Sequence, residues 1–270
     1  MKTFIITGAT QGIGRGIALQ QIQEGNKVIA IGNSNQNGQS LVAEAKSLAQ
    51  GDNLTFVQAD LSLVAENKRV IEYIQSNFTQ IDGLIMCAAK HSQTYTETAE
   101  GFETTLALAY LSRYELTYGL KDLLEKGNEP FILNVCGTGM KGDVNWEDLG
   151  FKKKFVPMKV MMHGSRLNDL LAVQFANENP SSNIHYILYN PMAVKTPGMD
   201  STGGFLMKLI FKMIAKPVSE AIKPIGDIIK NRPTDKLISF TQKKVNSLTM
   251  ETFNQANAKR LDELTRELLG

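Results

Sequence analysis

Short, nearly continuous apolar runs alternate with amphipathic stretches along the first two thirds of the chain. The pattern predicts strands at Thr3–Ile6, Lys27–Gly32, Leu54–Asp60, Gly83–Ala88, Phe131–Cys136 and Ile184–Tyr189. It also predicts helices, of which three span about Gln39–Ala49, Gly101–Lys126 and Met158–Asn179. Apolar strands separated by helices are typical of a parallel sheet that is covered on both faces.

We therefore expect an α/β fold with a Rossmann-like, doubly wound parallel sheet, whose ligand lies outside the carboxyl ends of the strands. No internal repeat, linker or break in composition is visible, so residues 1–270 are predicted to form a single domain. A less regular helical flap is expected at about 196–233. A last strand at Lys236–Phe240 and a final helix at about Met250–Leu269 should follow it.

The most apolar window, Phe205–Ile214, lies in this flap. It is about half the length of a membrane span, and it contains Lys208 and Lys212, which are four residues apart and so share one face of a helix. Three interpretations stay open: a helix that covers a ligand pocket, a core helix, or a helix that contacts a membrane surface.

The composition narrows the functional class. A formal charge of +2 and a pI near 8.4 are too mild for a nucleic-acid-binding protein. Cys87 and Cys136 both lie in apolar runs, as expected of buried thiols in a reducing compartment, and the three scattered histidines form no metal-binding pattern. Met1 and Lys2 lead directly into the first strand, unlike a signal peptide. We expect a cytoplasmic protein with a small-molecule ligand, no metal and no membrane span.

The segment Thr7–Gly16 is the strongest functional signal. It stands between a predicted strand and a predicted helix, in the arrangement that holds a dinucleotide pyrophosphate. Glycines allow a tight turn and a close approach of the backbone to the phosphates, and the free N–H groups of the helix start attract negative charge. The predicted contacts here are Gly8, Thr10, Gln11, Gly12, Ile13, Gly14 and Arg15.

Two further strand ends are expected to bind the nucleotide. Asp60 could accept a hydrogen bond from the adenine amino group while Leu61 packs on the ring; alternatively, Asp60 only caps the next helix. The second strand ends in Asn33 and Ser34, without the acidic residue that would bind a ribose 2′-hydroxyl and repel a 2′-phosphate. Because Arg15 could pair with that phosphate, the sequence favours NADP(H), with NAD(H) as the alternative.

These residues resemble the short-chain dehydrogenases/reductases, whose loop Thr-Gly-x-x-x-Gly-x-Gly is matched by Thr7–Gly14. Four segments resemble the retinol-dehydrogenase-like branch, namely Gly101–Glu103, Asn145–Leu149, Ser165–Asn168 and Asn257–Leu261. The resemblance implies a Rossmann fold, a nicotinamide cofactor, and a homodimer or homotetramer built on two long helices. It also implies cofactor contacts by Ala88, Ala89, Arg166, Pro191, Val194 and Thr196.

The catalytic positions depart from the family. In the alignment that the resemblance implies, the family's asparagine, serine, tyrosine and lysine are replaced by Ala109, Gly137, Met162 and Arg166. None of the seven tyrosines is followed by a lysine four residues later, so the Tyr-x-x-x-Lys motif is absent rather than shifted. Loss of a general acid typically costs about 10²–10⁴ in rate.

Three side chains are candidates to replace the lost groups. Thr138 could hold a substrate oxygen, His163 titrates in a suitable range, and Arg166 could donate to ribose hydroxyls. His163 could equally be a packing or surface residue, because it is turned by about 100° from the tyrosine position. Two hypotheses follow: an atypical oxidoreductase acting on a small, lipophilic substrate, or a catalytically inactive nucleotide-binding or regulatory module. Non-redox chemistry in the same pocket is a further alternative.

Overall fold

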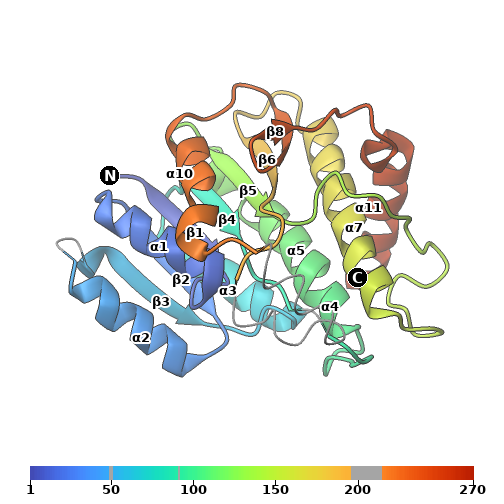
Figure 1. The fold of residues 1–270 in the computed structure, drawn as a ribbon, viewed down its shortest axis with the longest axis horizontal. Coiled ribbons are helices and arrows are strands. Elements are labelled where there is room, and N and C mark those ends of the chain that lie inside the picture. Colours follow the sequence, from blue (N-terminus) through green and yellow to red (C-terminus); the bar gives the residue numbers. More distant parts are fainter. Residues whose placement is uncertain (49–50, 91, 196–214) are drawn as a thin grey trace.

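The computed structural model describes residues 1–48, 51–90, 92–195 and 215–270. One eight-stranded sheet runs through the molecule (Figure 1), in the order β3-β2-β1-β4-β5-β6-β7-β8. Its strands are β1 (Thr3–Thr7), β2 (Lys27–Gly32), β3 (Leu54–Gln58), β4 (Gly83–Met86), β5 (Phe131–Val135), β6 (His185–Asn190), β7 (Leu237–Thr241) and β8 (Lys244–Val245). All neighbours are parallel except β7 and β8. The doubly wound α/β fold is confirmed, and the strand order reverses between β1 and β4, which is where such folds bind ligands.

Helices cover both faces of the sheet. One face carries α1 (Gly12–Gln23), α2 (Asn35–Lys46), α9 (Val218–Ala221) and α10 (Lys223–Lys230). The other carries α3 (Val64–Asn77), α4 (Thr104–Leu106), the π-helical turn η2 (Ala107–Leu111), α5 (Ser112–Gly119), α6 (Lys121–Leu124), α7 (Pro157–Glu178) and α11 (Gln255–Leu269). Short 3₁₀ turns lie at η1 (Gly51–Asn53) and η4 (Glu251–Phe253).

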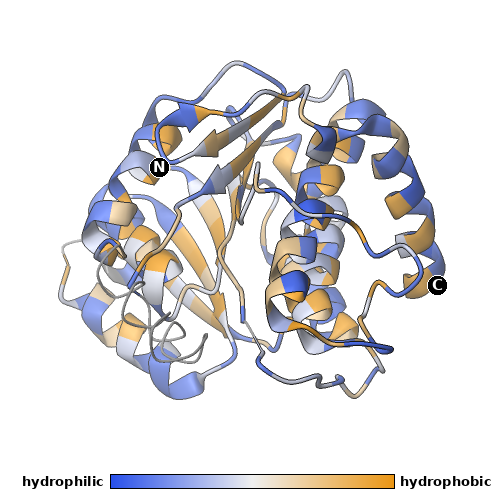
Figure 2. Cartoon of the chain, turned by 45° about the vertical axis from the view of Figure 1, so that its right-hand side comes forward, coloured by the Kyte–Doolittle hydropathy of each residue, from blue (hydrophilic) through white to orange (hydrophobic). Residues whose placement is uncertain are grey.

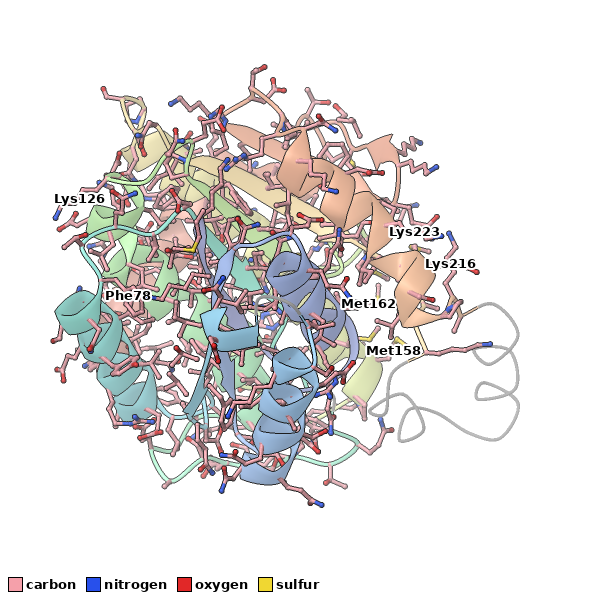
Figure 3. The ribbon with its side chains drawn as sticks, turned by 90° about the vertical axis from the view of Figure 1, so that its left-hand side faces the viewer. Phe78, Lys126, Met158, Met162, Lys216 and Lys223 are labelled. Carbon is pink, nitrogen blue, oxygen red and sulfur yellow. The ribbon has the colours of Figure 1, made fainter. Side chains whose placement is uncertain are left out.

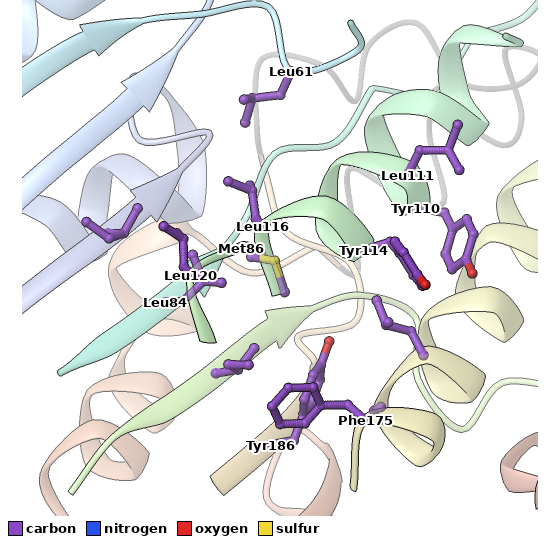
Figure 4. Packing of buried hydrophobic residues seen from close by; sticks show 14 of the residues in the cluster. Leu61, Leu84, Met86, Tyr110, Leu111, Tyr114, Leu116, Leu120, Phe175 and Tyr186 are labelled. Carbon is purple, nitrogen blue, oxygen red and sulfur yellow. The ribbon is translucent and has the colours of Figure 1, made fainter. Parts of the chain in front are cut away.

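The alternation of side chains along each strand divides the core between the two faces. Ile5 of β1 joins the cluster on the α5 and α7 side, whereas Phe4 and Ile6 join the cluster on the α1 side. The strands are accordingly apolar along most of their length (Figure 2). Tyr186 of β6 and Phe175 of α7 are among the largest buried side chains, and their rings pack 5.5 Å apart (Figure 4).

The stretch predicted as helical at about Gly101–Lys126 holds α4, η2, α5 and α6, with a π-helical turn at η2. Two other predicted helix starts were wrong, each for a local reason. Helix α2 begins earlier than expected because the Ser34 side chain caps it, accepting from Asn37 N at 3.3 Å. Helix α11 begins later than expected because Asn254 caps it, accepting from Asn257 N at 2.9 Å.

Helix α11 lies beside α7 of the same chain (Figure 1), and its side chains reach η2 and α5. Tyr110 and Thr265 share a hydroxyl hydrogen bond of 2.6 Å, and Tyr114 donates to Asp262 at 2.7 Å. The helix therefore covers part of the surface on which the resemblance places a dimer interface. Assembly into a homodimer or homotetramer stays a prediction, and it has to leave room for α11.

Of the predicted flap at 196–233, only the part from Ala215 onward is described, and there α9 and α10 pack on α1. A Cβ on Gly16 of α1 would lie 3.1 Å from the side chains of Val218 and Ile222. Thr196 and the apolar window Phe205–Ile214 lie outside the described residues. Across the described part of the chain, no helix is both long and apolar enough to cross a membrane.

Candidate cofactor and active site

The segment after β1 forms a tight cradle around the start of α1. Gly8 has φ +63°, and a Cβ there would lie 2.7 Å from Ala88 N. A Cβ on Gly14 would lie only 2.4 Å from the carbonyl oxygen of Gly8. Backbone meets backbone at both points, so any side chain larger than that of glycine would push the turn apart.

The helix that follows the cradle has an open N-terminus. Gln11, at the N-cap position, makes no side-chain capping bond, and the first turn of α1 holds no acidic residue. Gly12 and Ile13 are only partly covered, whereas the buried Thr10 packs against Gly32. Free N–H groups and the positive end of the helix dipole are thus available to an anion. The cradle and the helix start together fit a dinucleotide pyrophosphate.

A shallow hollow of about 460 Å³ lies at the carboxyl ends of β2 and β3. It is lined by Asn33, Gln58, Ala59, Asp60, Leu63 and Glu66. The Oδ1 atom of Asp60 accepts from the backbone and hydroxyl of Ser62, at 3.0 and 2.7 Å, so Asp60 also organises the turn into α3. Leu61 is 3% exposed and packs in the core (Figure 4), so the side chain that faces the hollow is that of Leu63.

Arg15 is engaged with α2. Its guanidinium pairs with Glu44 at 2.5 Å and donates to Ser40 Oγ at 3.3 Å. Ser34 is used as the cap of α2, and Asn33 is exposed. A 2′-phosphate would therefore compete with Glu44 for Arg15.

The end of β4 is tied to the cradle. Ala88 N donates to Thr7 Oγ1 at 3.2 Å, and Ala89 is exposed. Beyond β6, Pro191 is half-buried and Val194 is buried in a parallel bridge to Lys216.

Arg166 and Asp169 form a buried ion pair on α7. Their side chains are 3% and 0% exposed, and Arg166 Nη2 lies 2.8 Å from Asp169 Oδ2. Arg166 also donates to the carbonyl oxygens of Gly137 and Met140. Asp169 Oδ2 in turn accepts from Gly139 N at 3.3 Å and from the hydroxyl of Thr252. This pair fastens the loop after β5 to α7 and to the segment before α11.

Thr138 is fully buried and faces the last strands of the sheet. Its hydroxyl lies 2.8 Å from Ser239 Oγ, and its carbonyl oxygen accepts from Asn190 Nδ2 at 3.2 Å. Neither polar group of Thr138 is presented to a ligand at the cradle.

A buried polar network that the sequence did not reveal lies behind the end of β4. Arg113 of α5, 3% exposed, donates to Ala88 O at 3.0 Å and to the side-chain oxygens of Asn134 and Asn168. Asn168 Nδ2 donates to Ala109 O, in the π-helical turn, at 2.8 Å. An arginine inside an otherwise apolar helix face was the only available signal for this network.

The family profile of the short chain dehydrogenases matches residues 2–147, a span that contains the glycine cradle and β1 to β5. The chain belongs to the short-chain dehydrogenase family. The matched residues end ahead of α7, which would carry the family's tyrosine and lysine.

Two curated proteins and one solved structure illustrate what the chain is similar to. An NmrA-like family domain-containing oxidoreductase of Aspergillus is 26% identical over 210 residues, 75% of this chain and 63% of that protein. Human retinol dehydrogenase 12 is 24% identical over 196 residues, 72% of this chain and 62% of that protein. The chain thus spans less than two thirds of both proteins. A short-chain dehydrogenase of Sphingobium yanoikuyae, solved with NADPH, has a TM-score of 0.67 at 18% identity, covering 100% of this chain and 95% of that one.

The positions at which the resemblance places the family's catalytic groups make contacts within the protein. Met162 lies one turn after Met158 on α7 (Figure 3), and a Cβ on Gly142 would lie 3.4 Å from Met162 Cβ. A Cβ on Gly137 would lie 2.4 Å from Ser165 Oγ, so a serine at this position requires the Ser165 hydroxyl to rotate away. Ala109 contributes only its carbonyl oxygen, which Asn168 occupies.

His163 is a packing residue in this short-chain dehydrogenase. It is 2% exposed, and its ring meets that of Phe151 edge to face at 5.1 Å. Burial lowers the pKa of His163 to about 4, although Asp148 opposes the shift. The imidazole is therefore neutral at physiological pH, and its Nε2 atom has no hydrogen-bond partner among the residues that the structure describes.

This depressed pKa predicts that acid destabilises the fold through His163. The folded-state pKa of about 4 lies below the unfolded value of about 6.5, so the stability contribution is complete above pH 6.5 and is lost as the pH falls towards 4. We expect the free energy of unfolding, measured in urea, to decrease more steeply with falling pH in the wild type than in His163→Gln. The difference between the two slopes should reach up to about 1.4 kcal/mol per pH unit. Parallel pH profiles of the two proteins would contradict the buried, neutral state of His163.

Proposed function

We propose that the protein binds NADP(H) at the cradle and transfers hydride to a small, lipophilic substrate that needs no proton from the protein. The observation that carries this proposal is that the cofactor cradle is complete while Arg166 and Thr138 are held by other protein groups. The related Sphingobium protein binds NADPH, in agreement with this cofactor.

The lack of a proton donor in the protein determines the class of substrate. Of the residues at the four catalytic positions, only Arg166 has a polar side chain, and it stays charged and paired with Asp169. A bound nicotinamide supplies the hydride. An iminium carbon that accepts hydride becomes an amine without a proton, and an activated alkene becomes an enolate that water can protonate. Both substrate types avoid the missing acid.

Exposed methionines support a lipophilic substrate. Met158, at the start of α7, is 47% exposed, and Met192, directly after the carboxyl end of β6, is 54% exposed. Methionine is flexible and polarisable, and it adapts to apolar ligands of different shapes.

A substrate panel tests the proposal. Purified protein and NADPH are incubated with cyclic iminium ions, enones and simple ketones, and NADPH absorbance is followed. We expect oxidation with the iminium ions or the enones and none with the ketones. Rapid turnover of simple ketones would contradict the proposed substrate class.

A second function is favoured by the same buried ion pair: a catalytically inactive member of the family that binds the dinucleotide as a nucleotide-binding or regulatory module. Arg166 and Asp169 fix the loop after β5 without presenting a reactive group. Saturable NADPH binding with no oxidation by any member of the panel would support this alternative over hydride transfer.

Because Arg15 is paired with Glu44, we expect that breaking this ion pair strengthens the preference for NADP(H) over NAD(H). Glu44→Gln should release the Arg15 guanidinium, which then pairs with the 2′-phosphate. Since exposed ion pairs contribute about 0.2–1 kcal/mol, NADPH affinity should rise by a factor of about 1.4 to 5 while NADH affinity stays the same. Calorimetric titration of both cofactors measures this. An equal change for NADH and NADPH would exclude the 2′-phosphate as the partner of Arg15.

A further inference from the structure

Arg113 is a buried cation whose hydrogen-bond partners among the described residues are all neutral. Its side chain is 3% exposed, and its hydrogen bonds go to the carbonyl oxygen of Ala88 and to the amide oxygens of Asn134 and Asn168. Among the described residues, the groups that influence its ionisation are Cys87, Cys136 and Tyr186, which are uncharged at neutral pH. Burial lowers the pKa of Arg113, but a guanidinium in a protein stays protonated.

The charges around the Arg113 guanidinium do not cancel. The thiol of Cys136, just after β5, is influenced by Asp169, Arg113 and Arg166. Arg166 and Asp169 neutralise each other in their ion pair at 2.8 Å. The positive charge of Arg113 is therefore left over at the carboxyl ends of β4 and β5.

The charge of Arg113 lies directly behind Ala88, which contacts the glycine cradle. Arg113 Nη2 donates to Ala88 O at 3.0 Å, while the backbone N and Cα of Ala88 lie 2.7 and 2.8 Å from the Cβ that Gly8 would carry. A dinucleotide with its pyrophosphate in the cradle would extend across the point where the strand order reverses, so its nicotinamide half would lie towards the ends of β4 and β5. There, the ring of the oxidised cofactor carries a positive charge and the ring of the reduced cofactor is neutral.

We propose that Arg113 makes this site select the reduced dinucleotide, because its uncompensated charge repels the oxidised nicotinamide and leaves the reduced one unaffected. The inference rests on the proposed binding of NADP(H) and goes beyond it by assigning the redox state that the protein holds. A unit charge about 10 Å away, in protein of effective dielectric constant about 20, changes an equilibrium roughly tenfold.

Two variants remove the charge by opposite routes. Arg113→Met deletes the cation, and Asn134→Asp keeps Arg113 in place but adds a carboxylate at the atom that accepts its hydrogen bond. Arg113→Lys keeps the charge. Arg232→Gln is the matched control, because Arg232 is also largely buried, with 8% of its side chain exposed, but it lies at the amino end of β5, where it pairs with Glu129.

Calorimetric titrations of each protein with NADPH and with NADP⁺, at one ionic strength, give the ratio of the two dissociation constants. We expect the wild type, Arg113→Lys and Arg232→Gln to share a preference for NADPH. The preference should fall about tenfold in both Arg113→Met and Asn134→Asp. An unchanged ratio in these two variants, with NADPH still bound, would overturn the role of Arg113 alone. Absence of binding of either cofactor by the wild type would overturn the proposed function and this inference together.

Discussion

Replacement of Gly14 by alanine is expected to weaken NADPH binding by at least about a hundredfold, because several charge-assisted hydrogen bonds are lost together. The new Cβ would lie 2.4 Å from Gly8 O, and neither backbone can yield without opening the turn. The start of α1 would then no longer face the phosphates. Calorimetric titration with NADPH measures the loss, and circular dichroism shows whether the fold persists.

Gly25→Ala is the matched control for this variant. Gly25 has φ +79°, so alanine is strained there as well, but a Cβ would meet nothing within 4 Å, and the residue lies beyond the far end of α1. This variant should lose some stability and keep its NADPH affinity. Equal affinity of Gly14→Ala and Gly25→Ala would show that the cradle is not the phosphate site.

Asp169→Ala is expected to lower the free energy of unfolding by about 3–5 kcal/mol. The substitution leaves the Arg166 guanidinium buried without its carboxylate, and it removes an acceptor from Gly139 N and from the Thr252 hydroxyl. The segment before α11 loses its hydrogen bond to α7, and the loop after β5 keeps only the bonds that Arg166 donates to Gly137 O and Met140 O. Urea unfolding, followed by circular dichroism, measures the difference.

The pair Arg166→Met and Asp169→Leu provides the control, because apolar replacement of both partners of a buried ion pair is often close to neutral. The double variant should therefore be more stable than Asp169→Ala. A second control is Glu263→Ala, which breaks the exposed contact of Lys259 with Glu263 at 3.9 Å and should change stability little. If Asp169→Ala and Glu263→Ala were equally stable, the ion pair on α7 would have no structural role.

The elements that could be predicted are those whose signal is local. β2 was predicted with its observed bounds, because a short apolar run with polar flanks suffices to define a buried strand. The turn at Thr7–Gly16 was evident from its glycines, of which Gly8 and Gly12 adopt a positive φ that other residues rarely take. Helix starts at Ser34 and Asn254 were missed because a single capping side chain decides them, and several polar neighbours compete for that role.

The remaining polar side chains bond to partners that lie far away in the sequence. The sequence predicts a missing tetrad, which stays a prediction, but it does not indicate that Thr138 bonds Ser239, 101 positions away, or that His163 packs on Phe151. The cover of α5 by α11 joins Tyr110 to Thr265, 155 positions apart. Such contacts follow from the topology of the sheet, which periodicity alone does not determine.

One measurement tests both the cofactor cradle and the catalytic positions. It records the fluorescence of NADPH mixed with the wild-type protein before and after a simple ketone is added. We expect a saturable signal of bound NADPH that persists after the ketone is added, because the cradle is complete and Arg166 is held by Asp169. Failure of the signal to form would contradict the cradle as a dinucleotide site. Consumption of bound NADPH by the ketone would contradict the conversion of the family's catalytic positions into structural contacts.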